Sequence, residues 1–139
     1  MKERSFLDTK VLVYADDLDA GDRRLRAREL LQEALETRSG VLSTQVLQEF
    51  FVVSTRKLGV RPEAARRKME LLTTLDVVRP QVADVLAAVD LHRLHEIGFW
   101  DGLILRAAQV AGCRVLLSED LQHGRRYDGV RVENPFRAP

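Results

Sequence analysis

Short apolar runs alternate along the chain with longer segments of helical periodicity. The apolar runs have the length of short buried strands, and they fall at residues 6–7, 41–42, 77–78, 115–117 and 130–132. Between them, apolar residues recur every three to four positions, as they do in amphipathic helices. We expect these helices to begin at Asp22, at Ser43 or Thr44, at Pro62 and at Pro80, because these residue types favour a helix N-terminus.

Three details of this pattern predict specific features of the structure. Gly40 is expected to stop the helix that begins at Asp22. The helix from Pro80 is expected to turn Val82, Val85, Leu86 and Val89 towards the core. The clearest stripe runs from Trp100 through Leu103, Ile104, Ala107 and Ala108 to Ala111 and is ended by Gly112. It predicts a core position for Trp100, from which the side chain would also shape the wall of a cleft beside Asp101.

Strands that alternate with helices predict an α/β fold. We expect a single domain over residues 1–139, with a central, mainly parallel sheet of four to five short strands flanked by helices on both faces. A chain of 139 residues with 45% hydrophobic content can bury a core of its own. We find no linker, internal repeat or low-complexity run in it.

Charge and cysteine content indicate the expected cellular compartment of the protein more than its function. The 22 Lys and Arg against 21 Asp and Glu leave a net charge of +1, so overall charge does not mark a nucleic-acid binder, although a local basic patch could still bind one. The single Cys113 allows no intrachain disulfide and reads as a small buried thiol, which suits a reducing cytoplasm. Without a signal peptide or a span-length apolar segment, the expected setting is cytoplasmic, with no membrane.

Acidic residues follow two of the predicted strands directly. Asp8 comes after the strand at 6–7, and Ser118, Glu119 and Asp120 come after the strand at 115–117. Ligands bind at the carboxyl ends of strands in an open parallel sheet, so these side chains are expected to meet at one edge. The simpler alternative is helix capping, in which Asp8 caps a segment that starts near Lys10.

Two further carboxylates lie on helices that would pack near this edge. Glu49 shares a helix side with Val46 and Val53, and Asp101 lies in a first helical turn. Each has a structural alternative, a rim-exposed charge for Glu49 and a favourable helix-terminal charge for Asp101. Taken together, converging carboxylates repel one another unless a cation is present, and an oxygen-only set suits Mg²⁺ or Mn²⁺ better than Zn²⁺. The pattern therefore favours a metal ligand at Asp8.

Four stretches together resemble the PIN domain, and more closely the VapC-type ribonuclease toxins of type II toxin–antitoxin systems. They are "FLDTKVLVYA", "STQVLQEFF", "FWDGLILRAA" and "VLLSEDLQHG", in matching order and spacing over nearly the whole chain. The resemblance implies a PIN-like nuclease domain over 1–139. Its catalytic and metal-binding residues would be Asp8, Glu49, Asp101 and Asp120, supported by Thr9 and Ser118. Glu119 could reach the metal instead of Asp120.

One residue departs from the pattern of this family. Lys10 stands where an Asn usually follows the "DT" of the first motif. Facing the site, its ammonium group would compete with a metal ion or stabilise a phosphate. As a residue of a first helical turn, we expect Lys10 to face away.

The resemblance implies Mg²⁺-dependent hydrolysis of RNA phosphodiester bonds, with one ion or two and with Mn²⁺ as a possible substitute. Asp120 could orient or deprotonate the attacking water, and the products would carry a 3′-hydroxyl and a 5′-phosphate. The implied substrate is tRNA or another structured RNA, so that cleavage inhibits translation. The implied partners are a cognate antitoxin protein and a second copy of the chain, and the exposed apolar part of a helix over 61–75 is a candidate contact surface.

RNA binding also needs positive charge beside the acidic cleft. The stretch "LQHGRRY" offers Arg125 and Arg126, with His123 as a further phosphate contact. Other basic runs lie at 23–28 and 66–68, where solvated helix faces are the simpler interpretation. His92 and His95 are spaced for one helix face, but without a third nitrogen or sulfur ligand they are interpreted as solvent-facing.

Rival functions remain open at this point. A haloacid dehalogenase-type phosphatase would need a second Asp where Lys10 stands, and no glycine-rich phosphate loop is present. An RNA-binding or protein-interaction module of the same fold, with the carboxylates acting only as caps, would show no dependence on divalent metal. A nuclease directed at DNA is a third possibility, because no feature of the sequence reads a 2′-hydroxyl group.

Overall fold

The computed structural model describes residues 3–137. Within them, six strands form one sheet in the order β3-β2-β1-β4-β6-β5. The strands are β1 (Ser5–Leu7), β2 (Gly40–Ser43), β3 (Asp76–Val78), β4 (Val115–Leu117), β5 (Arg126–Tyr127) and β6 (Val130–Glu133). All neighbours pair in parallel except β5 and β6, which form an antiparallel ribbon. The predicted mainly parallel α/β fold is confirmed, and the five predicted strands are present.

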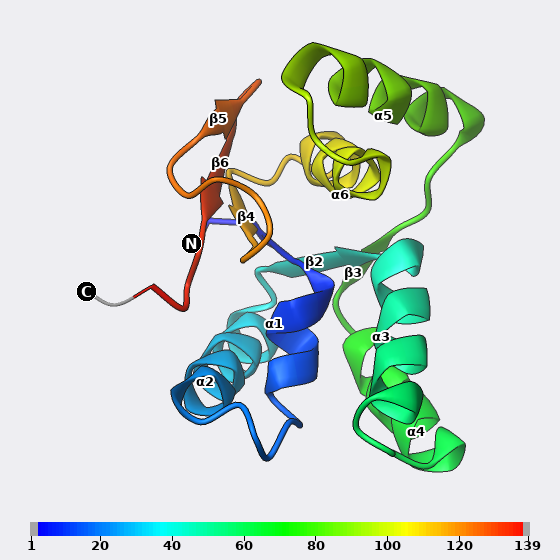
Figure 1. The fold of residues 1–139 in the computed structure, drawn as a ribbon, viewed down its shortest axis with the longest axis vertical. Coiled ribbons are helices and arrows are strands. Elements are labelled where there is room, and N and C mark those ends of the chain that lie inside the picture. The colour runs from blue at the N-terminus through cyan, green and yellow to red at the C-terminus, as the bar shows by residue number, and fades with distance from the viewer. Residues whose placement is uncertain (1–2, 138–139) are drawn as a thin grey trace.

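Helices cover both faces of this sheet (Figure 1). One side carries α1 (Thr9–Tyr14), α2 (Asp22–Thr37), α3 (Thr44–Arg56) and α4 (Pro62–Leu72), and the other carries α5 (Val82–His95) and α6 (Phe99–Val110). The chain passes from β1 outward through β2 to β3, and then crosses back over the other face to β4 on the far side of β1. The direction of winding therefore reverses between β1 and β4, which makes the carboxyl ends of these two strands a topological switch point.

The core is built on the apolar runs that the sequence marks as strands. Phe6, Leu42 and Leu116 are fully buried, and Phe6 pairs in register with Val41 on one side and Leu116 on the other. Cys113 is buried as predicted, and burial raises the pKa of its thiol to about 11.

Helix boundaries agree with the expected capping residues in part. Ser43 caps α3 by accepting a hydrogen bond from the backbone N–H of Val46, and Pro62 opens α4. The N-cap of α2 is instead Gly21, with Asp22 as the first residue of the helix. The expected stop at Gly40 is wrong: Arg38 ends α2 in a left-handed conformation, and Gly40 begins β2, where a Cβ would lie 2.8 Å from that of Ala34.

The predicted core face of α5 is wrong. The helix begins at Val82, and the apolar residues expected to point inward are exposed, with Val82 77% and Leu86 62% accessible. The buried face holds Ala88 instead, because α6 packs there backbone to backbone: a Cβ on Gly102 would come within 2.8 Å of the Ala88 carbonyl oxygen. Close contact between two small residues therefore marks the packing of α5 on α6, and Leu91 is the one large apolar residue that α5 buries.

Three other features complete the comparison with the sequence. Trp100 is 65% exposed, so its predicted core position is wrong. The short strand β5 escaped prediction because its two residues carry no recognisable period. No helix among residues 3–137 is long and apolar enough to cross a bilayer.

Candidate active site

Asp8 lies at the switch point, between the end of β1 and the start of α1. Its backbone N–H continues the sheet by donating to the carbonyl of Leu117, and its Oδ1 caps α1 by accepting from the N–H of Thr9 at 2.7 Å. The Ser118 hydroxyl donates to Oδ2, also at 2.7 Å. The predicted capping role of Asp8 is confirmed, and only one of its oxygens is needed for it.

The carboxyl group of Asp8 is 5% exposed. Burial raises its pKa from 3.8 to about 6, the hydrogen bonds from Ser118 and Thr9 oppose the rise, and the negative charges of Asp120 and Glu49 add to it. An ionised carboxylate in this position is costly unless a cation lies beside it. Helix capping alone would not require this degree of burial.

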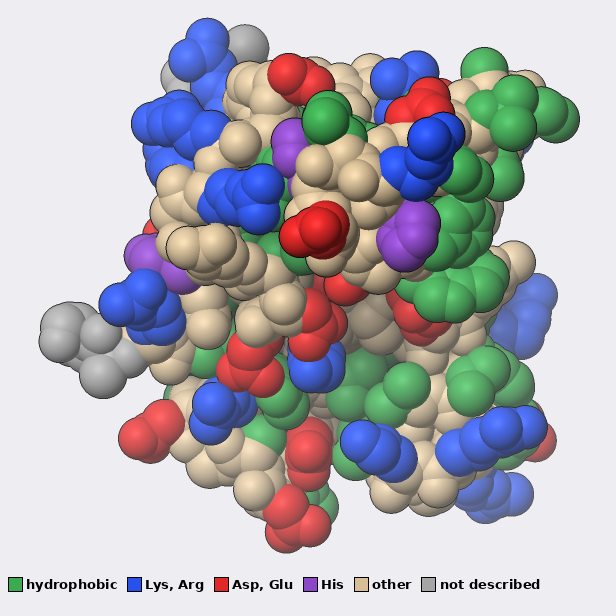
Figure 2. Space-filling model, turned by 45° about the horizontal axis from the view of Figure 1, so that its top comes forward, with side chains coloured by type: hydrophobic (Ala, Val, Ile, Leu, Met, Phe, Trp, Pro, Cys, Tyr) green, Lys and Arg blue, Asp and Glu red, His purple; other side chains and the backbone are tan. Residues whose placement is uncertain are grey.

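A cleft of about 530 Å³ opens beside Asp8, and all four predicted carboxylates line it. Asp8 follows β1, Glu49 comes from α3, Asp101 from the first turn of α6, and Asp120 from the loop after β4. Burial raises the pKa of Asp101, and the charges of Asp120 and Glu49 raise it further. Four segments far apart in the sequence thus bring their carboxylates close enough for the negative charges to affect one another. Figure 2 shows acidic side chains gathered in and beside a hollow on this face, with apolar side chains along its border.

Glu49 is held in the cleft by short polar side chains. The Thr9 hydroxyl donates to Glu49 Oε1 at 2.9 Å, and Gln45 Nε2 reaches the same oxygen at 3.4 Å. Gln45 also donates to the carbonyl of Trp100 at 3.2 Å, which ties α3 to the start of α6. The supporting position predicted for Thr9 therefore has a definite contact.

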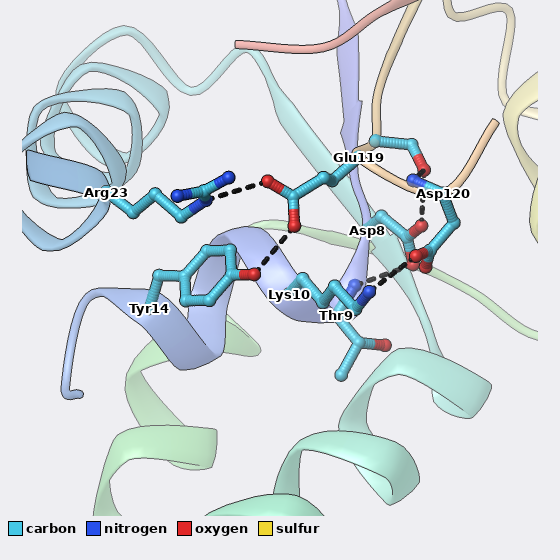
Figure 3. Close-up of polar contacts among 8 residues, drawn as sticks. Asp8, Thr9, Lys10, Tyr14, Arg23, Glu119 and Asp120 are labelled. Carbon is cyan, nitrogen blue, oxygen red and sulfur yellow. Dashed lines mark hydrogen bonds and ion pairs between the residues drawn. The ribbon is translucent and has the colours of Figure 1, made fainter. Parts of the chain in front are cut away.

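The loop after β4 sends its two acidic side chains in different directions (Figure 3). Ser118 is fully buried, and its hydroxyl oxygen accepts the backbone N–H of Asp120 at 3.2 Å while the hydroxyl donates to Asp8. Glu119 is not among the cleft residues; it accepts from the Tyr14 hydroxyl at 2.7 Å and from Arg23 at 2.8 Å. Burial alone would raise the pKa of Glu119, but these two donors hold it below its usual value. Asp120, not Glu119, faces the other carboxylates.

Lys10 faces the site, so the expectation that it points away is wrong. It lies in the first turn of α1, beside the cleft, and its flexible stem carries Nζ to within 2.6 Å of Asp120 Oδ1 (Figure 3). This hydrogen bond, more than any other contact, raises the pKa of Lys10. The ammonium group is therefore a charged member of the cleft lining.

The residues predicted to bind RNA lie outside the cleft lining. His123 Nδ1 accepts the backbone N–H of Asn134 at 3.0 Å, and the Arg125 guanidinium stacks over the ring of Tyr127 at 4.8 Å from its centroid. Arg126 is exposed in β5. Arg126 pairs with Arg131, level with the start of β4 and not with its carboxyl end. The contact of these three residues with RNA stays a prediction.

Several cleft residues escaped sequence analysis. Gln45, Gln48, Val52 and Val53 line it from α3, whereas Trp100 lines it as expected. Helical spacing around Glu49 could have placed the α3 residues on one side, because positions three and four apart share a face. The exposure of Trp100 had no such signal, since its position continues an apolar stripe.

The chemistry of the donor set fits a hard divalent cation, because it consists of carboxylate and hydroxyl oxygens around a buried acidic group. Among residues 3–137, no three acidic, His or Cys side chains stand ready around one point that could hold a metal ion. Two hydrogen bonds already engage members of the set, from Thr9 to Glu49 and from Lys10 to Asp120. Each bond uses one carboxylate oxygen and leaves the other available, so metal binding would require the carboxylates to move closer together without breaking these bonds.

Comparisons with known proteins agree with this architecture. The model of the PIN domain matches residues 5–129. A toxin–antitoxin complex from Klebsiella pneumoniae has a TM-score of 0.69 at 20% identity, covering 96% of this chain and 99% of that one. The sarcin–ricin loop cleaving toxin VapC20 of Mycobacterium tuberculosis has a TM-score of 0.68 at 18% identity, covering 81% and 86% of the two chains. DNA-bound VapBC from Salmonella typhimurium has a TM-score of 0.65 at 20% identity, covering 95% and 98%.

These structural similarities, at 18% and 20% identity, establish a shared fold. The sequence comparison with curated proteins gives no match. The family model, by contrast, spans the chain from β1 through β5, ends just before β6, and includes all four cleft carboxylates. The chain belongs to the PIN-domain family.

Proposed function

We propose that this protein is a Mg²⁺-dependent endoribonuclease and the toxin of a toxin–antitoxin pair. The observation that carries the proposal is the convergence of Asp8, Glu49, Asp101 and Asp120 at the switch point of a PIN-domain sheet. A buried acidic group surrounded by further carboxylates is costly to maintain for stability alone. Its retention is accounted for by a divalent cation, for which Mn²⁺ could replace Mg²⁺.

The predicted catalytic and supporting residues have distinct roles in this mechanism. The four carboxylates form the candidate metal site, with Asp8 as its buried centre and Asp120 also available to orient or deprotonate the attacking water. Bound Mg²⁺ would offset the carboxylate charge, polarise the scissile phosphate and lower the pKa of a coordinated water. Thr9 and Ser118 fix the directions of the Glu49 and Asp8 carboxylates through their hydroxyl groups.

The proposed substrate is a structured RNA such as a tRNA, cleaved in the cytoplasm so that translation stops. Support comes from the similarity in fold to a toxin described as cleaving the sarcin–ricin loop. Arg125, Arg126 and His123 are proposed to contact the backbone of the RNA outside the cleft lining, and Arg126 is exposed to solvent.

A cognate antitoxin and a second copy of the chain are the proposed protein partners. Support comes from the similarity to chains solved within toxin–antitoxin complexes. Exposed apolar side chains suitable for protein contacts lie mainly on α5, including Val82, Leu86 and Leu94, and Figure 2 shows such side chains gathered over this part of the molecule. The helix α4, favoured from the sequence, exposes Leu71 among its large apolar residues.

A catalytically weak RNA-binding module is the second candidate, favoured by the ion pair that Lys10 forms with Asp120. A cleavage assay separates the two functions. The protein is incubated with a structured RNA and with a DNA hairpin of the same sequence, in Mg²⁺ and in EDTA, beside an Asp8→Asn, Asp101→Asn double variant. We expect RNA fragments with 5′-phosphates only for the wild type in Mg²⁺. RNA that binds to both proteins but stays intact would favour the module, and cleavage of the DNA alone would redirect the substrate assignment.

A further inference from the structure

Lys10 is the one cationic side chain among the described residues that line the carboxylate cleft. Four carboxylates and one ammonium group leave the lining with a formal charge of −3, from −4 and +1. Within this negatively charged cleft, the ammonium group of Lys10 has one specific partner. Its Nζ lies 2.6 Å from Asp120 Oδ1, and among the described residues it forms no ion pair with another carboxylate of the cleft.

Three consecutive residues at the start of α1 organise the acidic side chains. Asp8 contributes its own carboxylate, Thr9 donates to Glu49, and Lys10 donates to Asp120. The backbone of Asp120 is fixed separately, because its N–H donates to the buried Ser118 hydroxyl. The main-chain position of Asp120 is therefore set without Lys10. The bond from Lys10 determines the direction in which the Asp120 carboxylate points.

We propose that Lys10 is a built-in cation at Asp120, which keeps this carboxylate out of the metal's ligand set and limits the cleft to one divalent ion. The inference rests on the proposed metal site and narrows its ligands from the four carboxylates to Asp8, Glu49 and Asp101. One divalent ion held by Asp8, Glu49 and Asp101 would reduce the charge of the lining from −3 to −1. A second ion at Asp120 would first have to displace the ammonium group and would then be repelled by it.

The proposal gives Lys10 a positioning function. Lys10 bonds one oxygen of the Asp120 carboxylate, so the other oxygen remains available to orient a water molecule. A small neutral side chain in place of Lys10 would leave Asp120 free to join the metal, and the cleft would then accept a second ion. Lys10 therefore controls the position of one carboxylate. The ion pair itself adds little stability, because both partners are partly exposed.

The test counts bound Mn²⁺ ions by the loss of the free-ion paramagnetic resonance signal, and checks for spin coupling between bound ions. It compares the wild type with Lys10→Met, Asp120→Asn and the double variant. Lys57→Met is the matched control, because Lys57 is also exposed and lies outside the cleft lining. Thermal unfolding in EDTA checks that all five proteins fold.

We expect about one Mn²⁺ per wild-type chain and about two in Lys10→Met, with a coupled signal from the pair. Affinity for the first ion should also rise roughly tenfold, since a neighbouring positive charge has been removed. Asp120→Asn should keep the stoichiometry at about one ion but lower the affinity for it, because the ammonium group of Lys10 loses its partner, and it should abolish the second ion of Lys10→Met. A Lys57→Met protein should behave as wild type.

Three results would overturn the inference, and only the last of them would also overturn the proposed metal site. Equal stoichiometry and affinity in the wild type and Lys10→Met, with clear metal binding in both, would refute the role of Lys10 while leaving the metal site intact. Two ions in the wild type would do the same. Absence of Mn²⁺ binding from all variants at millimolar metal would refute the proposed metal site itself, and the role of Lys10 with it.

Discussion

Replacing Asp8 by asparagine should stabilise the protein in the absence of metal. The side chain is 5% exposed, and burial raises the pKa of its carboxyl group from 3.8 to about 6. A difference of roughly two pKa units corresponds to about 3 kcal/mol of folding free energy lost when the group ionises. Asparagine is also an effective N-cap, and the Ser118 hydroxyl can rotate to suit its amide, so the contacts of the site survive the change.

The sign of this effect depends on pH. The pKa of Asp8 is higher in the folded protein than in the unfolded chain. Between pH 3.8 and about 6, the folded protein therefore keeps a proton on this carboxyl group that the unfolded chain loses. The penalty is absent below pH 3.8, grows as the pH rises through this window, and is complete above it. Asp8→Asn should therefore gain about 3 kcal/mol over the wild type at pH 8, or about 10 °C in Tm, and little at pH 4.

Urea unfolding in EDTA at several pH values measures this difference. Asp90→Asn on the exposed face of α5 is the control, since it removes one negative charge without touching the cleft. Added Mg²⁺ should then stabilise the wild type and not Asp8→Asn, because binding to the folded state adds to its stability. A variant less stable than the wild type at pH 8, or a gain of the same size at pH 4, would refute the assignment of Asp8 as a strained, buried carboxylate.

Three smaller predictions concern its surroundings. Ser118→Ala removes the hydroxyl that bonds the Asp8 carboxylate and should cost about 1.5–3 kcal/mol at pH 8 in urea unfolding, with a smaller loss at pH 4. Glu119→Gln should cost under about 1 kcal/mol, since its partner Arg23 is half exposed, and should leave Mg²⁺ affinity unchanged in a calorimetric titration; a large loss of affinity would return Glu119 to the metal site. Gly102→Ala should destabilise the protein by about 1–3 kcal/mol in the same unfolding assay, because its Cβ would meet the backbone of α5, and an unchanged midpoint would show that α5 moves freely.

Much of the site follows from local rules applied to the sequence. Asp8 and Asp120 could be placed together because each follows a buried strand, and parallel strands share a carboxyl edge. Asp101 could be placed near them because it opens the helix that leads into β4. These predictions needed only the order of elements, which hydrophobic periodicity supplies.

The features that escaped prediction depend on contacts between distant segments. The direction of Lys10 is decided by Asp120, 110 residues away, and a flexible stem gives no sequence signal of where its ammonium group will lie. The outward face of α5 is decided by the close approach of Gly102 to Ala88, which outweighs the pattern of large apolar residues. Tertiary packing overrides local pattern at both places.

The central claim, that the acidic cleft binds a divalent cation, is tested most directly by titration calorimetry with Mg²⁺. The comparison is between the wild type and the Asp8→Asn, Asp101→Asn double variant, both shown to be folded by circular dichroism. We predict a saturable binding heat for the wild type that the variant lacks. Equal heats from both proteins, or none from either at millimolar Mg²⁺, would contradict the metal site and leave the four carboxylates as caps and surface charges.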